Sequence, residues 1–140
     1  NHPDGKIHFV SSQVYEKLAY RGTSEGIIGI YKTKEFDLNN YQPKDNASII
    51  VVESVEKPGN LGAILRSCEA FGIDALIVTD SRVDFYNPNV LRSSVGCFFG
   101  MNVFSATNEE TLAFLQENNF KIYTTFMDET AEDLYKKNFN

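Results

Sequence analysis

The sequence predicts an α/β fold, a mostly parallel sheet with flanking helices, on three observations. Segments with strand and helix patterns alternate from Ala47 onward, the order that builds parallel sheets with right-handed crossovers. The first strand-like segment, residues 48–52, is rich in β-branched residues, as expected for a strand buried on both faces. Hydrophobic residues make up 42% of the 140 residues, which is enough to bury the core of one domain.

The order of the elements follows from periodicity and from residues that start or stop helices. After the first strand, apolar residues recur at helical spacing between Leu61 and Cys68, which predicts an amphipathic helix over residues 60–71 that Gly72 ends. The elements expected after it are a strand over 75–78, a helix that Asn87-Pro88 opens and Gly96 ends, a strand over 98–104, a helix over 108–117, a strand over 121–126 and a short helix over 132–136.

Residues 1–46 have a different character and are interpreted as the edge of another domain followed by a linker. Val14 to Leu18 has a short amphipathic pattern, residues 26–31 resemble a strand, and Phe36 to Lys44 is polar and contains proline. The first residues resemble neither a signal peptide nor a transit sequence, and the chain reads like one entered partway through. We therefore expect a boundary between parts 1–46 and 47–140.

The charge distribution argues against a broadly basic nucleic-acid-binding surface. The net charge is −6; residues 1–46 carry six basic and six acidic side chains, and residues 47–140 carry seven basic and thirteen acidic ones. Any RNA site in the second part must therefore be a local patch of cations rather than a basic field over the whole protein.

The two cysteines, Cys68 and Cys97, are expected to be buried, reduced thiols. They lie 29 residues apart in apolar surroundings, and the two histidines, His2 and His8, lie far away in the N-terminal region. A metal site needs ligands at short spacing, so no metal is expected, and reduced thiols favour a cytoplasmic protein. No run of 18 apolar residues is present, so no membrane span is expected.

The loop after the first strand is the first candidate for chemistry. In residues 53–63, Asn60 is expected to cap the following helix, and Gly59 and Gly62 allow a phosphate or another backbone to approach closely. The loop lacks both the dinucleotide-binding pattern of three glycines and the Gly-Lys-Ser/Thr of a P-loop. A well-capped turn with glycines for packing is the alternative interpretation.

Arg66 is the candidate whose position on the helix is not explained by packing. At 100° per residue it lies about 140° from Leu61, away from the apolar stripe, and its neighbours one turn away have very small side chains. A guanidinium in that position can reach whatever lies against the helix. The alternative is a solvent-exposed arginine paired with Glu69.

Two segments resemble a known family. Residues 58–72, with Asn60, with Arg66 six residues later and with the closing Ala70-Phe71-Gly72, are similar to the first motif of the SpoU/TrmH-type RNA ribose 2′-O-methyltransferases of the SPOUT superfamily. Arg92-Ser93-Ser94-Val95-Gly96-Cys97 resembles the family's Arg-x-Ser-x-Gly-Ala segment, with Cys97 in place of alanine. The resemblance covers about Ser48 to Phe139.

The resemblance implies an activity and a set of residues. It implies methyl transfer from S-adenosylmethionine to a ribose 2′-hydroxyl of tRNA or rRNA, by a homodimer and without a metal. Arg66 and Asn60 take the catalytic positions, with Asn60 orienting the arginine or the ribose. Arg66, Arg92 and Ser94 are the expected RNA contacts; a surface cation is the alternative for Arg92, and capping or packing is the alternative for Ser94. Thr125 lies where the family's donor pocket begins, with a buried strand threonine as the alternative. A guanidinium holds its proton too tightly to be a general base, so Arg66 is expected to clamp a phosphate and stabilise the reacting oxygen.

The resemblance also implies what flanks these residues. Residues 1–46 look like the end of an N-terminal RNA-binding domain with its linker, and residues 47–140 look like an α/β-knot methyltransferase domain that ends before the knot. By itself this stretch is expected to be inactive. Two alternatives remain: a non-enzymatic RNA-binding paralogue, and a flavodoxin-like nucleotide-binding or signalling domain, for which the β/α order alone would suffice.

Overall fold

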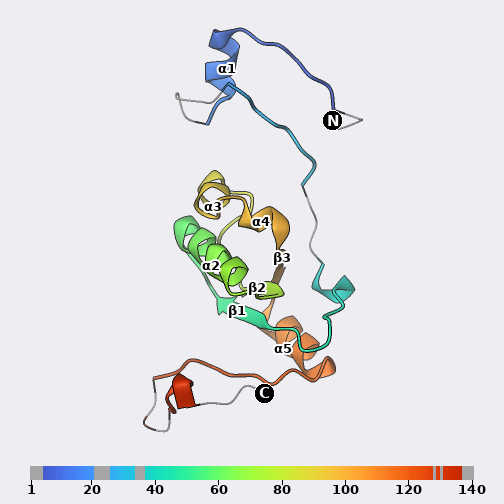
Figure 1. The fold of residues 1–140 in the computed structure, drawn as a ribbon, viewed down its shortest axis with the longest axis vertical. Helices are drawn as coiled ribbons and strands as arrows, with labels where there is room; N and C mark the ends of the chain where they lie inside the picture. Colours follow the sequence, from blue (N-terminus) through green and yellow to red (C-terminus); the bar gives the residue numbers. More distant parts are fainter. Residues whose placement is uncertain (1–4, 21–25, 34–36, 128, 130, 137–140) are drawn as a thin grey trace.

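The computed structural model describes residues 5–20, 26–33, 37–127, 129 and 131–136. Its centre is a three-stranded sheet in the order β1-β2-β3 (Figure 1). All three strands are parallel, as the sequence predicted. The strands are β1 (Ile49–Glu53), β2 (Ala75–Thr79) and β3 (Asn102–Ala106). Every residue of β2 is buried, which agrees with a central strand covered on both faces.

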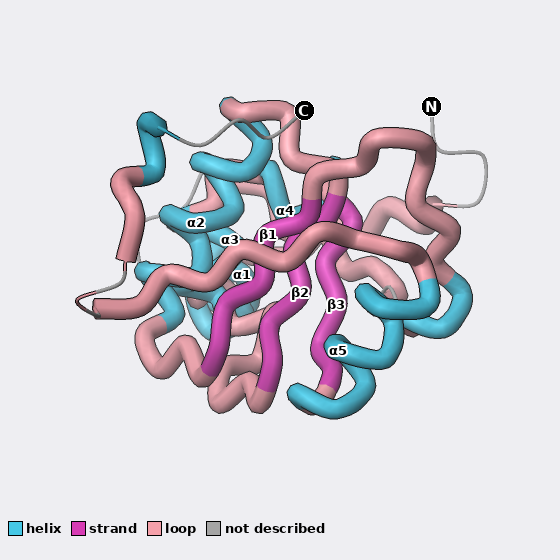
Figure 2. The backbone as a smooth tube through the Cα atoms, turned by 90° about the horizontal axis from the view of Figure 1, so that it is seen from below, coloured by secondary structure: helices cyan, strands magenta, loops and turns pink. Residues whose placement is uncertain are grey.

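Helices cover both faces of this sheet (Figure 2). Residues Leu76 and Val78 of β2 face one core, and Ala75 and Ile77 face the other, as the two-residue period of a strand requires. The first core is covered by helices α2 (Pro58–Ala70), α3 (Pro88–Ser93) and α4 (Cys97–Gly100). The second is covered by α5 (Asn108–Glu117). We call these the α2 face and the α5 face.

Sequence signals for the helix starts are confirmed at α3 and α5. Asn87 caps α3 by accepting a hydrogen bond from the Asn89 backbone, and Pro88 occupies the first turn. Thr107 and Glu110 form a reciprocal capping box at the start of α5. The short amphipathic pattern of residues 14–18 lies in α1 (Ser12–Leu18), and the short helix predicted over residues 132–136 is the 3₁₀ helix η2 (Leu134–Lys136).

The expected role of Asn60 as a helix cap is wrong. Helix α2 begins two residues earlier, with Lys57 at the capping position and Pro58 in the first turn, so Asn60 lies inside that turn. Proline favours the first helical position because its missing N–H would have no partner there anyway.

Three predicted strands differ in the structure. Residues 97–100 form α4, so β3 begins at Asn102 rather than at Phe98, and Phe98 packs into the α2-face core. Residues 26–31 and 121–126 form no strand in the described chain. Their composition suits a strand, but a strand also needs a neighbouring strand for its backbone hydrogen bonds.

The predicted linker is partly integrated into the domain. The 3₁₀ helix η1 (Leu38–Asn40), capped by Asp37, buries Leu38 in the α5-face core. The ring of Tyr41 lies 5.0 Å from that of Phe104 and 6.0 Å from that of Phe114, measured between centroids. Residues 37–46 therefore pack against the sheet, although the pattern alone indicated a polar connector.

A small polar cluster fixes this segment at the amino ends of the strands. Lys44 pairs with Asp74 at 2.6 Å, and Asp74 also accepts a 2.8 Å hydrogen bond from the Ser48 backbone. Asn102 donates to the Asp74 carbonyl at 3.0 Å, so β1, β2 and β3 are tied together there. The hydrogen bond from Lys44, followed by that from Ser48, lowers the pKa of Asp74 below its ordinary value.

Both cysteines are free thiols, as expected, but only one is buried. Cys68 packs in the α2-face core, whereas Cys97 is partly exposed at the start of α4. Burial raises the pKa of the Cys68 thiol, which keeps it protonated. Within the described residues, no helix has the length and apolar character needed to cross a membrane.

Candidate functional site

The two sequence segments singled out for chemistry meet where α2 crosses α3. Gly62 of α2 is buried against Ser93 of α3. A Cβ added at Gly62 would lie 2.8 Å from the Ser93 backbone carbon, closer than real contacts allow. Only glycine therefore permits this approach. Gly62 was predicted to allow a phosphate or another backbone to come close, and the neighbour that does so is the α3 backbone at Ser93.

An open hollow of about 410 Å³ lies beside this crossing. Pro58 and Gly59 from the first turn of α2 form one side, and Asn89, Arg92 and Ser93 of α3 form the other. The Ser93 hydroxyl donates to the Asn89 carbonyl at 2.6 Å, so its hydrogen is used within α3. The exposed guanidinium of Arg92 gives the hollow its positive charge, which suits an anionic group such as a phosphate.

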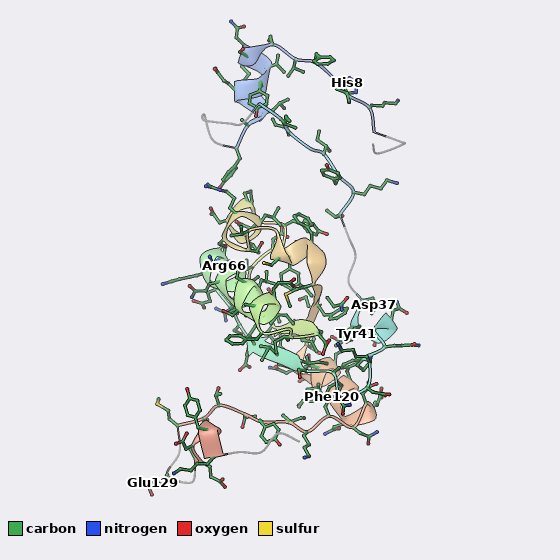
Figure 3. The ribbon with its side chains drawn as sticks, in the orientation of Figure 1. His8, Asp37, Tyr41, Arg66, Phe120 and Glu129 are labelled. Atoms are coloured by element: carbon green, nitrogen blue, oxygen red, sulfur yellow. The ribbon has the colours of Figure 1, made fainter. Side chains whose placement is uncertain are left out.

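Arg66 lies on the same side of α2 as this hollow. Seven residues separate it from Gly59, so the two positions differ by only about 20° around the helix and by ~10 Å along it. Side chains on a helix tilt toward its N-terminus, which directs the long Arg66 side chain back toward Gly59. Arg66 is exposed and projects from α2 (Figure 3), and within the described chain it makes no ion pair with Glu69 or any other residue.

Asn60 is exposed in the first turn of α2, and its backbone N–H donates to the Lys57 carbonyl at 3.0 Å. Six residues separate it from Arg66, which places the two about 120° apart around the helix and ~9 Å apart along it. The helix therefore does not bring the Asn60 amide against the Arg66 guanidinium. Of the two roles considered for Asn60, contact with a ribose fits this placement better than orientation of the arginine.

Ser94 and Thr125 lie in surroundings different from those expected of RNA and donor contacts. Ser94 is fully buried, and its hydroxyl donates to the Leu91 carbonyl at 2.9 Å, so the packing alternative agrees with the structure and an RNA contact does not. Thr125 was expected at the end of a strand, but it is exposed in a segment without a strand.

The carboxyl ends of the strands carry a polar network that sequence reasoning missed. The Asn108 side chain donates to Glu53 at 3.0 Å and to Asp80 at 2.9 Å, joining the ends of β1 and β2 to α5. Ser54 and Asp80, each directly after a strand, have positive φ angles of 48°. The sequence shows polar residues at the ends of these strands, which could have pointed to the network. It does not show their partner, because Asn108 is 55 residues from Glu53 and nothing in its local sequence indicates the contact.

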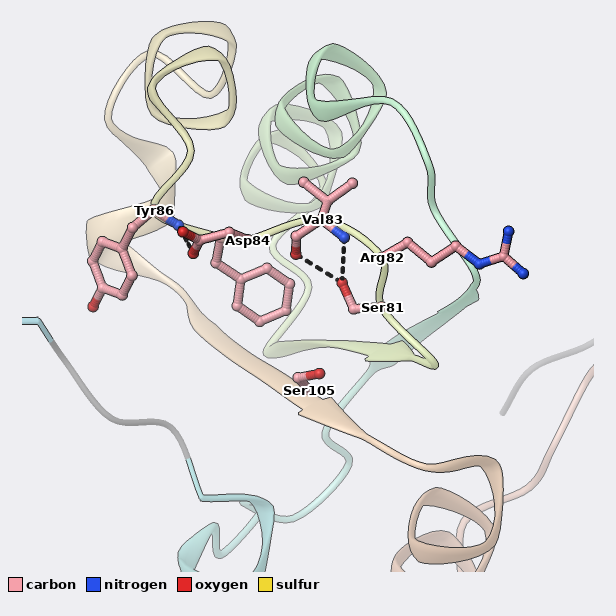
Figure 4. A pocket seen from close by; sticks show the side chains of 7 residues that line it. Ser81, Arg82, Val83, Asp84, Tyr86 and Ser105 are labelled. Atoms are coloured by element: carbon pink, nitrogen blue, oxygen red, sulfur yellow. Dashed lines mark hydrogen bonds between the residues drawn. The ribbon is translucent and has the colours of Figure 1, made fainter.

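A second hollow, of about 460 Å³, lies between the loop after β2 and the edge of β3 (Figure 4). The loop is braced from within: Ser81 donates to the Val83 carbonyl at 2.9 Å, and Asp84 accepts a 2.9 Å hydrogen bond from the Tyr86 backbone. Ser105 of β3 faces the loop across the hollow. In the described part of the chain, no group of three or more histidine, cysteine, aspartate or glutamate residues could hold a metal ion.

Comparison with known proteins gives a family for most of the chain. Residues 47–140 match the SpoU rRNA methylase family. An uncharacterized tRNA/rRNA methyltransferase of Borreliella burgdorferi is 37% identical over 112 residues, which are 78% of this chain and 48% of that protein. A 23S rRNA guanosine 2′-O-methyltransferase of Bacillus subtilis is 30% identical over 83 residues, 59% of this chain and 34% of that enzyme.

Solved structures agree with the sequence comparison. The crystal structure of an RNA 2′-O ribose methyltransferase matches with a TM-score of 0.63 and 38% identity, over 78% of this chain and 42% of that one. The SpoU methyltransferase AviRb of Streptomyces viridochromogenes, solved in complex with the cofactor AdoMet, matches with a TM-score of 0.58 and 26% identity, over 63% of this chain and 35% of that one. The chain spans about half the length of the curated relatives it matches.

Proposed function

Because the chain belongs to the SpoU rRNA methylase family, we propose that the protein transfers a methyl group from S-adenosylmethionine to a ribose 2′-hydroxyl of RNA. The observation that supports this most strongly is the crossing of α2 and α3, which brings the Arg66 and Arg92 segments to one hollow. That arrangement suits an RNA backbone, because two guanidinium groups can each take a phosphate oxygen pair. The family membership favours this function over a flavodoxin-like nucleotide-binding domain.

Arg66 supplies the charge at the reacting oxygen in this proposal. Its guanidinium has no competing carboxylate in the described chain, so its planar fork is available for a phosphate and for the 2′-oxygen. Negative charge builds on that oxygen as it attacks, and a positioned cation stabilises this charge without taking the proton. The proton leaves to a neighbouring acceptor or to water.

Arg92 and Asn60 take positioning roles in this proposal. Arg92, in the hollow, binds a neighbouring phosphate and so fixes the register of the RNA backbone. Asn60, exposed in the first turn of α2, offers an amide to the ribose hydroxyls. Holding the 2′-oxygen in line with the reacting carbon is itself a large part of such catalysis.

S-adenosylmethionine would supply a methyl group on a sulfonium, which is a good leaving group. AviRb has been solved with AdoMet, and this supports the same donor here. In the described chain Thr125 is exposed and lines neither hollow, so the geometry supports the RNA side of the reaction, and support for the donor comes from the comparison with AviRb. The assignment of Thr125 to the donor pocket stays a prediction.

The wider setting of the site is part of the same proposal. We expect a homodimer that acts on tRNA or rRNA in the cytoplasm, with residues 1–46 belonging to an RNA-binding region ahead of the catalytic domain. Exposed apolar side chains such as Phe71 and Val95 are consistent with a protein partner, and two free thiols are consistent with a reducing compartment.

The chemical identity of the product tests this function. RNA from cells lacking the gene, incubated with the full-length protein and radiolabelled S-adenosylmethionine, should carry the label in alkali-resistant dinucleotides. Alkaline cleavage requires a free 2′-hydroxyl, so methylation there blocks it. Label found only on bases would contradict ribose methylation, and RNA binding with no transfer would indicate a non-enzymatic paralogue.

A further inference from the structure

We propose that the hollow between the loop after β2 and Ser105 binds an unpaired RNA base beside the nucleotide held at Arg92. This hollow is lined by the half-buried rings of Phe85 and Tyr86, by the hydroxyl-bearing Ser105 and by Asp84. Aromatic faces stack on bases of any sequence, and hydroxyl or carboxylate groups bind base edges. The inference extends the proposed function, since it assumes that the α2 face binds RNA.

The aromatic rings are held in place by the core. Tyr86 lies edge-on to Phe98, with 5.2 Å between ring centroids, and Phe85 lies 6.4 Å from the same ring. Phe98 is only 1% exposed, so both rings rest on a fixed support. A ring that is already ordered loses little conformational entropy when a base stacks on it.

The charges of this hollow fit a base better than a phosphate. Arg82 also lines the hollow, but its side chain extends away from Asp84 and Ser105 (Figure 4), and its guanidinium pairs with Glu56 at 2.9 Å. Asp84 contributes a carboxylate, which repels phosphate but accepts hydrogen bonds from the amino groups of bases such as cytosine. The hollow at Arg92 has the opposite character, a cation without a carboxylate among its lining residues.

The two hollows are close enough to serve neighbouring nucleotides. Tyr86 lines one and Asn89 lines the other, and three residues of chain span at most about 11 Å. The surface pair of Arg82 and Glu56 links the loop after β2 to the residues just before Pro58. A single RNA strand can therefore place a phosphate at Arg92 and a base against Tyr86.

Oligonucleotide binding by the full-length protein tests the base site. The probes are a short fluorescein-labelled oligocytidylate and an abasic ribose-phosphate strand of equal length. Tyr86→Leu should weaken binding of the oligocytidylate by roughly 5- to 150-fold, the usual value of one stacked base, and leave binding of the abasic strand unchanged. Tyr86→Phe, which keeps the ring, should bind almost as well as the unaltered protein.

Phe99→Leu is the matched control for this experiment. Phe99 also packs against Phe98, with 5.3 Å between ring centroids, but it is 62% exposed and does not line the hollow. It should bind both probes normally. Equal losses in the Tyr86→Leu and Phe99→Leu variants, an equal loss on the abasic strand, or an unaltered protein that does not prefer the base-bearing strand would each overturn the proposal. Turnover of the Arg66 variants does not enter this readout, so the proposed function can fail separately.

Discussion

The two faces of the sheet are built from different kinds of residue. On the α2 face, Gly62 lets α3 approach closely, exposed Arg92 lines the resulting hollow, and exposed Arg66 lies farther along the same side of α2. On the α5 face, Leu38 and Tyr41 add apolar packing from a segment before the sheet. Both faces bury comparable strand residues, so burial alone does not mark the site. The difference is that one face combines close backbone contact with exposed cations.

Removing apolar packing on the α5 face should have the largest effect on stability. Leu38 is 6% exposed, so Leu38→Ala should lower the free energy of unfolding by about 2–5 kcal/mol. Ile30→Ala is the matched control: Ile30 is 92% exposed, and its loss should change stability by less than ~0.5 kcal/mol. Urea denaturation measures both. Equal, small effects would mean that residues 37–46 are a linker after all.

A methyl group at the helix crossing should have the next largest effect. Gly62→Ala forces α2 and α3 apart, because the added carbon meets the Ser93 backbone and not only a flexible side chain. We expect a loss of ~1–3 kcal/mol in unfolding free energy and weaker RNA binding, since Arg92 moves with α3. Gly59→Ala provides the comparison: its added carbon would meet nothing within 4 Å, so stability should be unchanged or up to ~1 kcal/mol higher. A destabilised Gly59→Ala variant with an unaffected Gly62→Ala variant would contradict the packing described here.

The smallest effect is expected from pH on the cluster at the amino ends of the strands. The pKa of Asp74 is lowered by the hydrogen bonds from Lys44 and Ser48, so its ionised form stabilises the fold. That contribution is complete above the ordinary value of 3.8 and is lost as the pH falls below it toward the folded pKa. Asp74→Asn should therefore be less stable near neutral pH, and the difference should shrink in acid. A difference that does not depend on pH would show that the carboxylate charge is unimportant.

Sequence patterns predicted the elements whose signals are local. The cap Asn87, the helix over residues 108–117 and the buried run of β2 each form the expected structure, because the stabilising contacts lie within a few residues. Residues 121–126 have strand composition but form no described strand, because a strand requires a partner elsewhere in the chain. Burial of Leu38 likewise depends on α5 and β3, which follow it by more than 60 residues.

In the candidate site, too, the local features were predictable from the sequence and the long-range contacts were not. The exposure of Arg66 follows from helical periodicity alone, and the structure agrees with it. The spatial meeting of its segment with Arg92 could not be read from sequence, because it depends on a helix crossing. The burial of Ser94, two residues from exposed Arg92, shows how one helical segment divides its residues between core and surface.

Turnover of Arg66 variants in the full-length protein tests the central claim most directly, the claim that an exposed guanidinium on the α2 face drives methyl transfer. Arg66→Ala and Arg66→Lys should each lower kcat by roughly 100- to 1,000-fold, because a lysine ammonium lacks the planar fork. Unfolding free energy should stay within ~0.5 kcal/mol, since the side chain is exposed. Arg92→Ala should instead weaken RNA binding with little change in kcat. Normal turnover by the Arg66→Lys variant would contradict the account.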